Sequence, residues 1–257
     1  MQHKEHPNYP RPVIWEALAE ILFVMPDERP WTGNLFGEMI KKVQNEYPTL
    51  EPIMEFGFSD SVPTLPKQRF RFVSASGKVA LQLSDNAFTV NFIGEYPGWK
   101  KLRETVATAW QSFFEVINPA FVYHTEIRYI NRIPLSELLQ SAEFWLSSND
   151  FLPNAALKSK HPMLSRTEAR LDEANLTKVT LVHLPPGDVQ GGHGKYGALL
   201  YDINRIYLGR MPIGLEALLA KIEDLHEDIW NIFNTSVTSN LENCMKGEPE
   251  DNASNLR

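Results

Sequence analysis

The chain has only one cysteine, Cys244, so it cannot form an intrachain disulfide. Such scarcity fits a reducing cytoplasm better than an oxidising compartment. No apolar run approaches the roughly 20 residues that a membrane-spanning helix needs. The first twelve residues, MQHKEHPNYPRP, lack the apolar core of a signal peptide and are expected to form an extended arm. We therefore expect a cytoplasmic protein that has no membrane contact.

The sequence also lacks an excess of positive charge. It has 25 Lys and Arg against 32 Asp and Glu, which gives a net charge of −7. Non-specific affinity for nucleic acid needs an excess of basic residues, so this balance disfavours nucleic acid as a partner. Hydrophobic residues make up 43% of the chain and charged residues 22%, a composition typical of a globular protein with a substantial core.

Motifs for catalysis and for metal binding are absent from the sequence. The seven histidines form no HExxH, HxH or HxxxH pair, and no GxSxG nucleophile turn occurs. The sequence therefore predicts no catalytic residues, no metal site and no cofactor. His226, beside Glu227 and Asp228 on a predicted helix, is expected on a solvated helix face.

The clearest positive feature is a period-two alternation over residues 121–133, FVYHTEIRYINRI. One face of this segment carries mostly apolar residues, namely Phe121, Tyr123, Thr125, Ile127, Tyr129, Asn131 and Ile133. The other face carries His124, Glu126, Arg128 and Arg132. Such a segment is typical of a strand in an antiparallel sheet that covers a core on one side only.

The remaining elements follow from hydrophobic periodicity and turn residues. Helices are predicted at 34–47, 98–117 and 214–244. Strands are predicted at 14–24, 54–58, 69–74, 78–84, 88–93, 165–172, 177–184 and 197–208, and residues 134–162 are expected to form a short helix and a loop. This order predicts an α+β fold in which a curved antiparallel sheet packs against two long amphipathic helices.

We expect residues 1–246 to form a single α+β domain, either as one unit or as two helix-on-sheet halves, 13–133 and 134–246. Residues 247–257 are polar and are expected to be a disordered tail.

The charged strand faces admit two interpretations. One is a solvated outer surface that carries cross-strand ion pairs. The other is a surface that binds an anion or a partner, because arginine matches the geometry of carboxylate and phosphate groups. The candidate residues on these strands are Glu126, Arg128, Arg132, Arg166 and Arg170.

A second set of candidates surrounds a predicted groove between the sheet and a long helix. Such grooves commonly bind small ligands. Its expected lining is Arg128, Tyr129, Asn131, Arg132 and the glycine-rich loop at 187–197, although a simple hairpin loop also explains those glycines. A hydrolase would instead use Asp188, His193 and Asp202.

Several segments together resemble a known family. They are PRPVIWEALAEILF at 10–23, YPGW at 96–99, RYINRI at 128–133, LYDI at 200–203 and LHEDIWNIF at 225–233. These segments are similar to a sporadically distributed, uncharacterised prokaryotic family of proteins of about this size. The chain departs from that family at Asn204, where members often carry an acidic residue. The resemblance implies a mobile accessory gene, such as a phage-defence or toxin–antitoxin-like module, and it assigns no catalytic residue.

The sequence therefore favours a non-catalytic cytoplasmic binding protein whose partner is another protein or a second copy of itself. The alternative is a protein that binds a small molecule or nucleotide in the groove between sheet and helix. A hydrolase is the least favoured interpretation.

Overall fold

The computed structural model describes residues 6–55, 58–59, 62–63, 67–186 and 196–247. Its strands are β1 (Ile14–Val24), β2 (Thr49–Glu55), β3 (Phe58–Ser59), β4 (Val62–Pro63), β5 (Lys67–Val73), β6 (Val79–Leu83), β7 (Ala87–Ile93), β8 (Phe121–Pro134), β9 (Met163–Arg170), β10 (Asn175–Leu184) and β11 (Ala198–Tyr207). Its helices are α1 (Gly33–Val43), α2 (Trp99–Ile117), α3 (Asn154–Leu157), α4 (Leu215–Ser236) and α5 (Ser239–Lys246), with a 3-10 turn at Ala142–Phe144.

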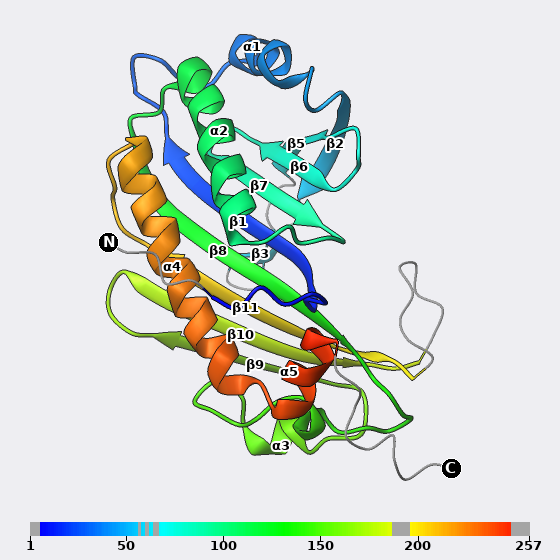
Figure 1. Cartoon of the computed structure of the whole chain (residues 1–257). Coiled ribbons are helices and arrows are strands. Elements are labelled where there is room, and N and C mark those ends of the chain that lie inside the picture. Colours follow the sequence, from blue (N-terminus) through cyan, green and yellow to red (C-terminus); the bar gives the residue numbers. More distant parts are fainter. Residues whose placement is uncertain (1–5, 56–57, 60–61, 64–66, 187–195, 248–257) are drawn as a thin grey trace.

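Nine of these strands form one open antiparallel sheet in the order β2-β5-β6-β7-β1-β8-β11-β10-β9. The two long helices, α2 and α4, lie across the same face of this sheet, and α1 packs against α2 (Figure 1). The predicted α+β class is confirmed. In the described residues, no helix is both long enough and apolar enough to cross a membrane.

Two series of elements with the same order, together with the edge strand β2, make up this sheet. In the first, β1 pairs with β7 at the end of the β5-β6-β7 meander, and α2 follows. In the second, β8 pairs with β11 at the end of the β9-β10-β11 meander, and α4 follows. The series meet where β1 and β8 pair antiparallel, and the second one begins at Phe121, earlier than residue 134.

Strand β1 forms although its Ala, Leu and Glu content favours a helix. Ala17, Ala19, Ile21 and Phe23 are buried under the helices, whereas the alternate side chains point to the other face. Because β1 has a strand on each side, its backbone groups are paired along both edges. Tertiary pairing therefore outweighs local propensity here.

The predicted alternation in β8 is confirmed from residue 125 onward, because every second side chain up to Ile133 is buried. It is wrong at the start of the strand. The register shifts there, since Leu22 pairs with His124 but Phe23 pairs with Val122. This β-bulge inserts one residue, so Val122 is buried in place of Phe121 and Tyr123.

The predicted final helix is wrong in its length, because it breaks after Ser236. The hydroxyl groups of Thr235 and Ser236 donate to carbonyl oxygens of the preceding turn, which weakens a helix end. Val237 is extended, and the Thr238 hydroxyl then accepts a hydrogen bond from the Leu241 N–H and caps α5. The chain thus turns, and α5 packs as a separate short helix.

A single hydrophobic core lies between the sheet and the helices. Helix α2 contributes the predicted stripe, in which Trp110 and Phe113 are fully buried and stack on one another. Within the described ranges, the opposite sheet face has no long helix over its central strands (Figure 1). We call it the open face.

Candidate functional site

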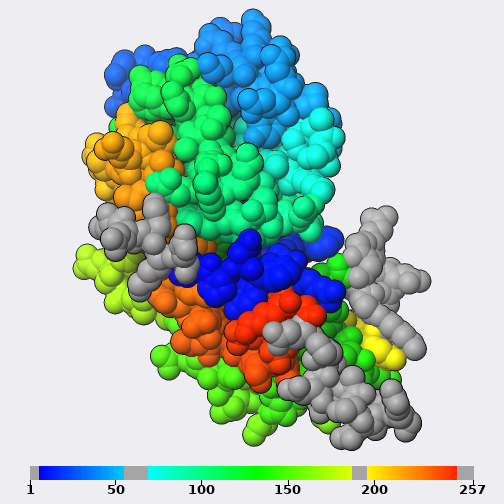
Figure 2. All heavy atoms as spheres, in the orientation of Figure 1, coloured from blue at the N-terminus to red at the C-terminus, as the bar shows by residue number. Residues whose placement is uncertain are grey.

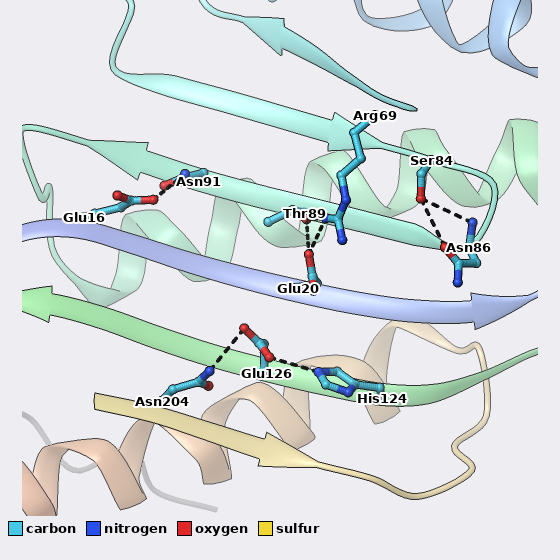
Figure 3. Close-up of polar contacts among 10 residues, drawn as sticks. All are labelled: Glu16, Glu20, Arg69, Ser84, Asn86, Thr89, Asn91, His124, Glu126 and Asn204. Carbon is cyan, nitrogen blue, oxygen red and sulfur yellow. Dashed lines mark hydrogen bonds and ion pairs between the residues drawn. The ribbon is translucent and has the colours of Figure 1, made fainter. Parts of the chain in front are cut away.

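A cluster of polar side chains occupies the open face where β1, β8 and β11 meet (Figure 3). Strict alternation places these side chains there, because their neighbours in each strand point into the core. The cluster consists of Glu16, Glu20, His124, Glu126, Arg128, Asp202 and Asn204, with Arg69, Thr89 and Asn91 at its border on β5 and β7.

Two carboxylates face one another at the centre of this cluster. Glu20 of β1 and Glu126 of β8 are direct partners in the antiparallel register. Their side chains are only 19% and 13% exposed. Like charges directly opposite each other on neighbouring strands are destabilising, so this position requires compensation from other groups.

Glu20 receives that compensation from within the protein. The Arg69 Nη1 donates to its Oε2 at 2.5 Å, and the Thr89 hydroxyl donates to the same oxygen at 2.9 Å. A third carboxylate, that of Glu16, accepts a hydrogen bond from the Asn91 amide at 2.8 Å.

Glu126 is hydrogen-bonded only to neutral or titratable groups in the described part of the chain, and the Arg128 guanidinium acts on it from a longer distance. The His124 Nε2 lies 3.0 Å from its Oε2, and the Asn204 amide donates to its Oε1 at 3.4 Å. Among the residues that the structure describes, no lysine or arginine lies within ion-pairing distance of Glu126. The half-buried carboxylate of Glu126 therefore lacks the direct arginine partner that Glu20 has.

Arg128 and Asp202 form an ion pair with each other. The guanidinium donates through Nε at 2.9 Å and through Nη2 at 2.7 Å to the two carboxylate oxygens. This bidentate pair raises the pKa of Arg128 above its usual value despite partial burial. Because both oxygens of Asp202 already accept hydrogen bonds, Asp202 is poorly placed to act as the base of a hydrolase.

The residues predicted to line a groove under a long helix are divided between the two faces. Tyr129 and Asn131 are buried on the helix-covered face, where the Tyr129 hydroxyl contacts His226 and the Asn131 amide donates to the Tyr201 carbonyl. Arg128 and Arg132 lie on the open face, and Arg132 stacks over Trp15 at 5.0 Å. One groove cannot contain all four side chains.

Arg166 and Arg170 are exposed on β9, at the edge of the sheet. Strands β10 and β11 separate them from β8, so they do not join the Glu126 cluster, and Arg166 pairs with Glu168 beside it. Asp188 and His193 lie outside the described residues.

Among the described residues, two groups of side chains bring together atoms that can ligate a metal. In one, Glu20, His124 and Glu126 place their ligand atoms within 4.8 Å of one another. The Arg69 guanidinium and the Thr89 hydroxyl already donate to one oxygen of Glu20, so this carboxylate is poorly placed to ligate a metal as well. The second group, His6, His226 and Glu227, lies on the helix-covered side of the sheet.

The expectation that His226 lies on a solvated face is wrong. It is only 6% exposed, and its ring stacks on Trp99 with centroids 3.9 Å apart. The spacing of the helix contained this information, because position 226 follows Ile222 by four residues and precedes Ile229 by three. The charged neighbours Glu227 and Asp228 obscured that pattern.

We predict that Glu126→Gln raises the free energy of unfolding by about 0.5 kcal/mol, because it removes the repulsion between two facing carboxylates. Urea denaturation at neutral pH measures this change. The matched control is Asp202→Asn on the next strand, which weakens the bidentate pair and should lower stability by about 1 kcal/mol. A loss of stability in Glu126→Gln would show that the carboxylate is fully satisfied within the protein.

Comparison with known proteins adds no functional information. No protein-family model matches the chain, and no curated protein shows significant similarity to it.

Proposed function

We propose that this chain is a non-catalytic binding protein that docks another protein on its open face, with a basic side chain of the partner placed against Glu126. The supporting observation is the half-buried Glu126 carboxylate, which faces Glu20 and, among the described residues, has no lysine or arginine within ion-pairing distance. Such an arrangement costs stability in the isolated chain, and departures of this kind from local charge complementarity are expected at functional or strained sites.

The composition of the open face suits this role. Half-buried apolar side chains separate the charged ones: Leu18 and Leu22 on β1, Ile130 on β8 and Leu200 on β11. Protein interfaces typically combine apolar contact with a few well-placed polar groups. A partner would cover the apolar positions and supply the missing positive charge.

A different protein fits this face better than a second copy of the chain. In a twofold-symmetric dimer the same patch lies on both subunits. The Glu20 and Glu126 carboxylates of one copy would then approach those of the other, and like-charge contacts disfavour association. We therefore propose a partner with a basic patch, encoded in the same accessory module that the family resemblance implies, and acting with it in the cytoplasm.

Affinity capture from the host organism tests this proposal. The bait is the full chain, compared with the double variant Glu20→Ala/Glu126→Ala and with Glu137→Ala, which removes an exposed carboxylate elsewhere. Quantitative mass spectrometry should identify a protein that wild type and Glu137→Ala recover equally and that the double variant recovers at least tenfold less. Equal recovery of every captured protein by all three baits would contradict the proposal.

A second candidate function rests on a cavity of about 580 Å³ between α1, α2 and β6. Lys42, Lys101, Glu46 and Glu104 line it together with Tyr47, so a small polar metabolite would find charges of both signs and an aromatic side chain there. A metabolite panel in a thermal-shift assay tests this function. A ligand that binds the cavity should raise the melting temperature of wild type but not of Thr108→Trp, which fills the space.

A further inference from the structure

The second ligand group, formed by His6, His226 and Glu227, lies where the N-terminal arm meets α4. The arm, residues 6–13, precedes β1 and has no regular secondary structure. In Figure 2 the N-terminal segment (blue) fills the space between α2 (green) and the C-terminal helices (orange and red). The Arg11 N–H donates to the Met245 carbonyl at 3.0 Å, which fixes the arm against α5.

The buried imidazole of His226 is held rigidly in place. Trp99 stacks flat on one side, with an interplanar angle of 11°, and the Nδ1 lies 3.0 Å from the Tyr129 hydroxyl. That hydroxyl in turn lies 3.2 Å from the Tyr96 hydroxyl. Tyr129 is buried and Tyr96 is half-buried, so this chain of hydrogen bonds sets the direction of the ring.

The second ring nitrogen of His226 takes no part in this chain of hydrogen bonds. Its Nε2 is buried and has no hydrogen-bond partner in the described part of the chain. Most buried side-chain nitrogens have a partner, so an orphan of this kind needs an explanation. If Nδ1 carries the proton and donates it to Tyr129, the Nε2 lone pair is free to bind a Lewis acid.

Two further ligand groups lie beside the His226 ring, and the His6 ring centroid is 5.4 Å from that of His226. His6 stacks on Trp230 with centroids 4.5 Å apart, and its Nε2 lies 2.5 Å from the Glu227 Oε1. The ligand atoms of His6, His226 and Glu227 all lie within 4.8 Å of one another. Two imidazole nitrogens and one carboxylate oxygen form a donor set that suits Zn²⁺, whereas Mg²⁺ and Ca²⁺ prefer oxygen ligands alone.

We propose that His6, His226 and Glu227 form a zinc-binding site that clips the N-terminal arm onto α4. Zinc bonds of about 2.0–2.2 Å would bring the three ligand atoms to within roughly 3.5 Å of one another. The arm and the Glu227 side chain have to adjust to achieve this, whereas the buried His226 ring can stay in place. Zinc replaces the proton between His6 and Glu227, and the fourth coordination position is left to water or an external ligand.

The surroundings match those of a metal-bound histidine. Ligating imidazoles usually donate their other N–H to a fixed acceptor, which orients the ring. The Tyr129 hydroxyl occupies that place for His226. The site lies on the helix-covered side of the sheet and does not depend on the partner-binding role proposed for the open face.

Zinc titration of the metal-free full chain, made without a polyhistidine tag, tests the site. Calorimetry should give one Zn²⁺ per chain, and Co²⁺ should produce the visible absorption of a tetrahedral complex. His6→Ala and Glu227→Gln should each weaken zinc binding at least tenfold. Because His6 lies in the arm, the His6→Ala protein should fold like wild type, and circular dichroism checks this.

The matched control is His124→Ala, which removes the only histidine from the Glu20–His124–Glu126 group and should leave zinc affinity unchanged. Zinc binding by His6→Ala with the wild-type affinity would overturn the proposal. A wild-type chain that binds no zinc, or that loses its zinc only in His124→Ala, would overturn it as well.

Discussion

Asp228→Ala should lower the free energy of unfolding by about 3 kcal/mol, although Asp228 itself is half exposed. The effect arises from its partner, Arg205, whose side chain is only 5% exposed beneath α4. The Arg205 Nε and Nη2 donate to one carboxylate oxygen of Asp228, and Nη1 donates to the Thr177 hydroxyl at 2.6 Å. Loss of the carboxylate leaves a buried guanidinium without a counter-charge, which is a strongly destabilising change.

Urea denaturation of wild type and Asp228→Ala measures this loss. Asp224→Ala is the matched control, because Asp224 lies one turn earlier on the same helix and makes only an exposed contact of 3.7 Å with Lys221. The control should change stability by less than about 0.5 kcal/mol. Adding Arg205→Met to Asp228→Ala should restore most of the loss, because it removes the unpaired charge. A failure of this second substitution to restore stability would show that Asp228 acts through something other than Arg205.

The second large effect is a loss of stability in acid that depends on His226. Burial and the neighbouring His6 lower the pKa of His226 from 6.5 to about 3. Below pH 6.5 the unfolded chain therefore binds a proton at this position, whereas the folded chain does not bind one until about pH 3. Acid thus favours the unfolded state throughout this window.

For this one group the loss should reach about 2.5 kcal/mol between pH 7 and pH 4.5. Carboxylates also titrate in this range, so the measurement compares wild type with His226→Gln, both in the presence of a chelator. With decreasing pH, the free energy of unfolding should fall less steeply in the variant than in wild type. The two slopes should differ by up to about 1.4 kcal/mol for each pH unit. Equal slopes for the two proteins would mean that the folded chain also protonates His226 near pH 6.5.

The sequence predicted most of the fold because each long element carries its own periodic signal. The residues of α2 predict its buried apolar stripe, and the residues of β8 predict its alternation from residue 125 onward. The exceptions have local physical causes: a bulge that shifts the register at Val122, and hydroxyl groups that end α4 at Ser236.

The candidate site was only partly predictable. Glu126 and Arg128 were identified from the charged face of β8. Glu20 was not, because its position opposite Glu126 depends on the register between two strands that are distant in sequence. The zinc ligands were missed for a similar reason, since nothing near His6 in sequence indicates that the arm lies on α4.

The pairing of β1 with β8 at the centre of the sheet has a consequence for biosynthesis. While the ribosome is still adding residues 25–120, the first meander can assemble, but one long edge of β1 has no neighbour. An unsatisfied strand edge of eleven residues is a site for misassembly with other nascent chains. Two charged side chains of β1, Glu16 and Glu20, would keep that edge soluble until β8 has been synthesised and pairs with it.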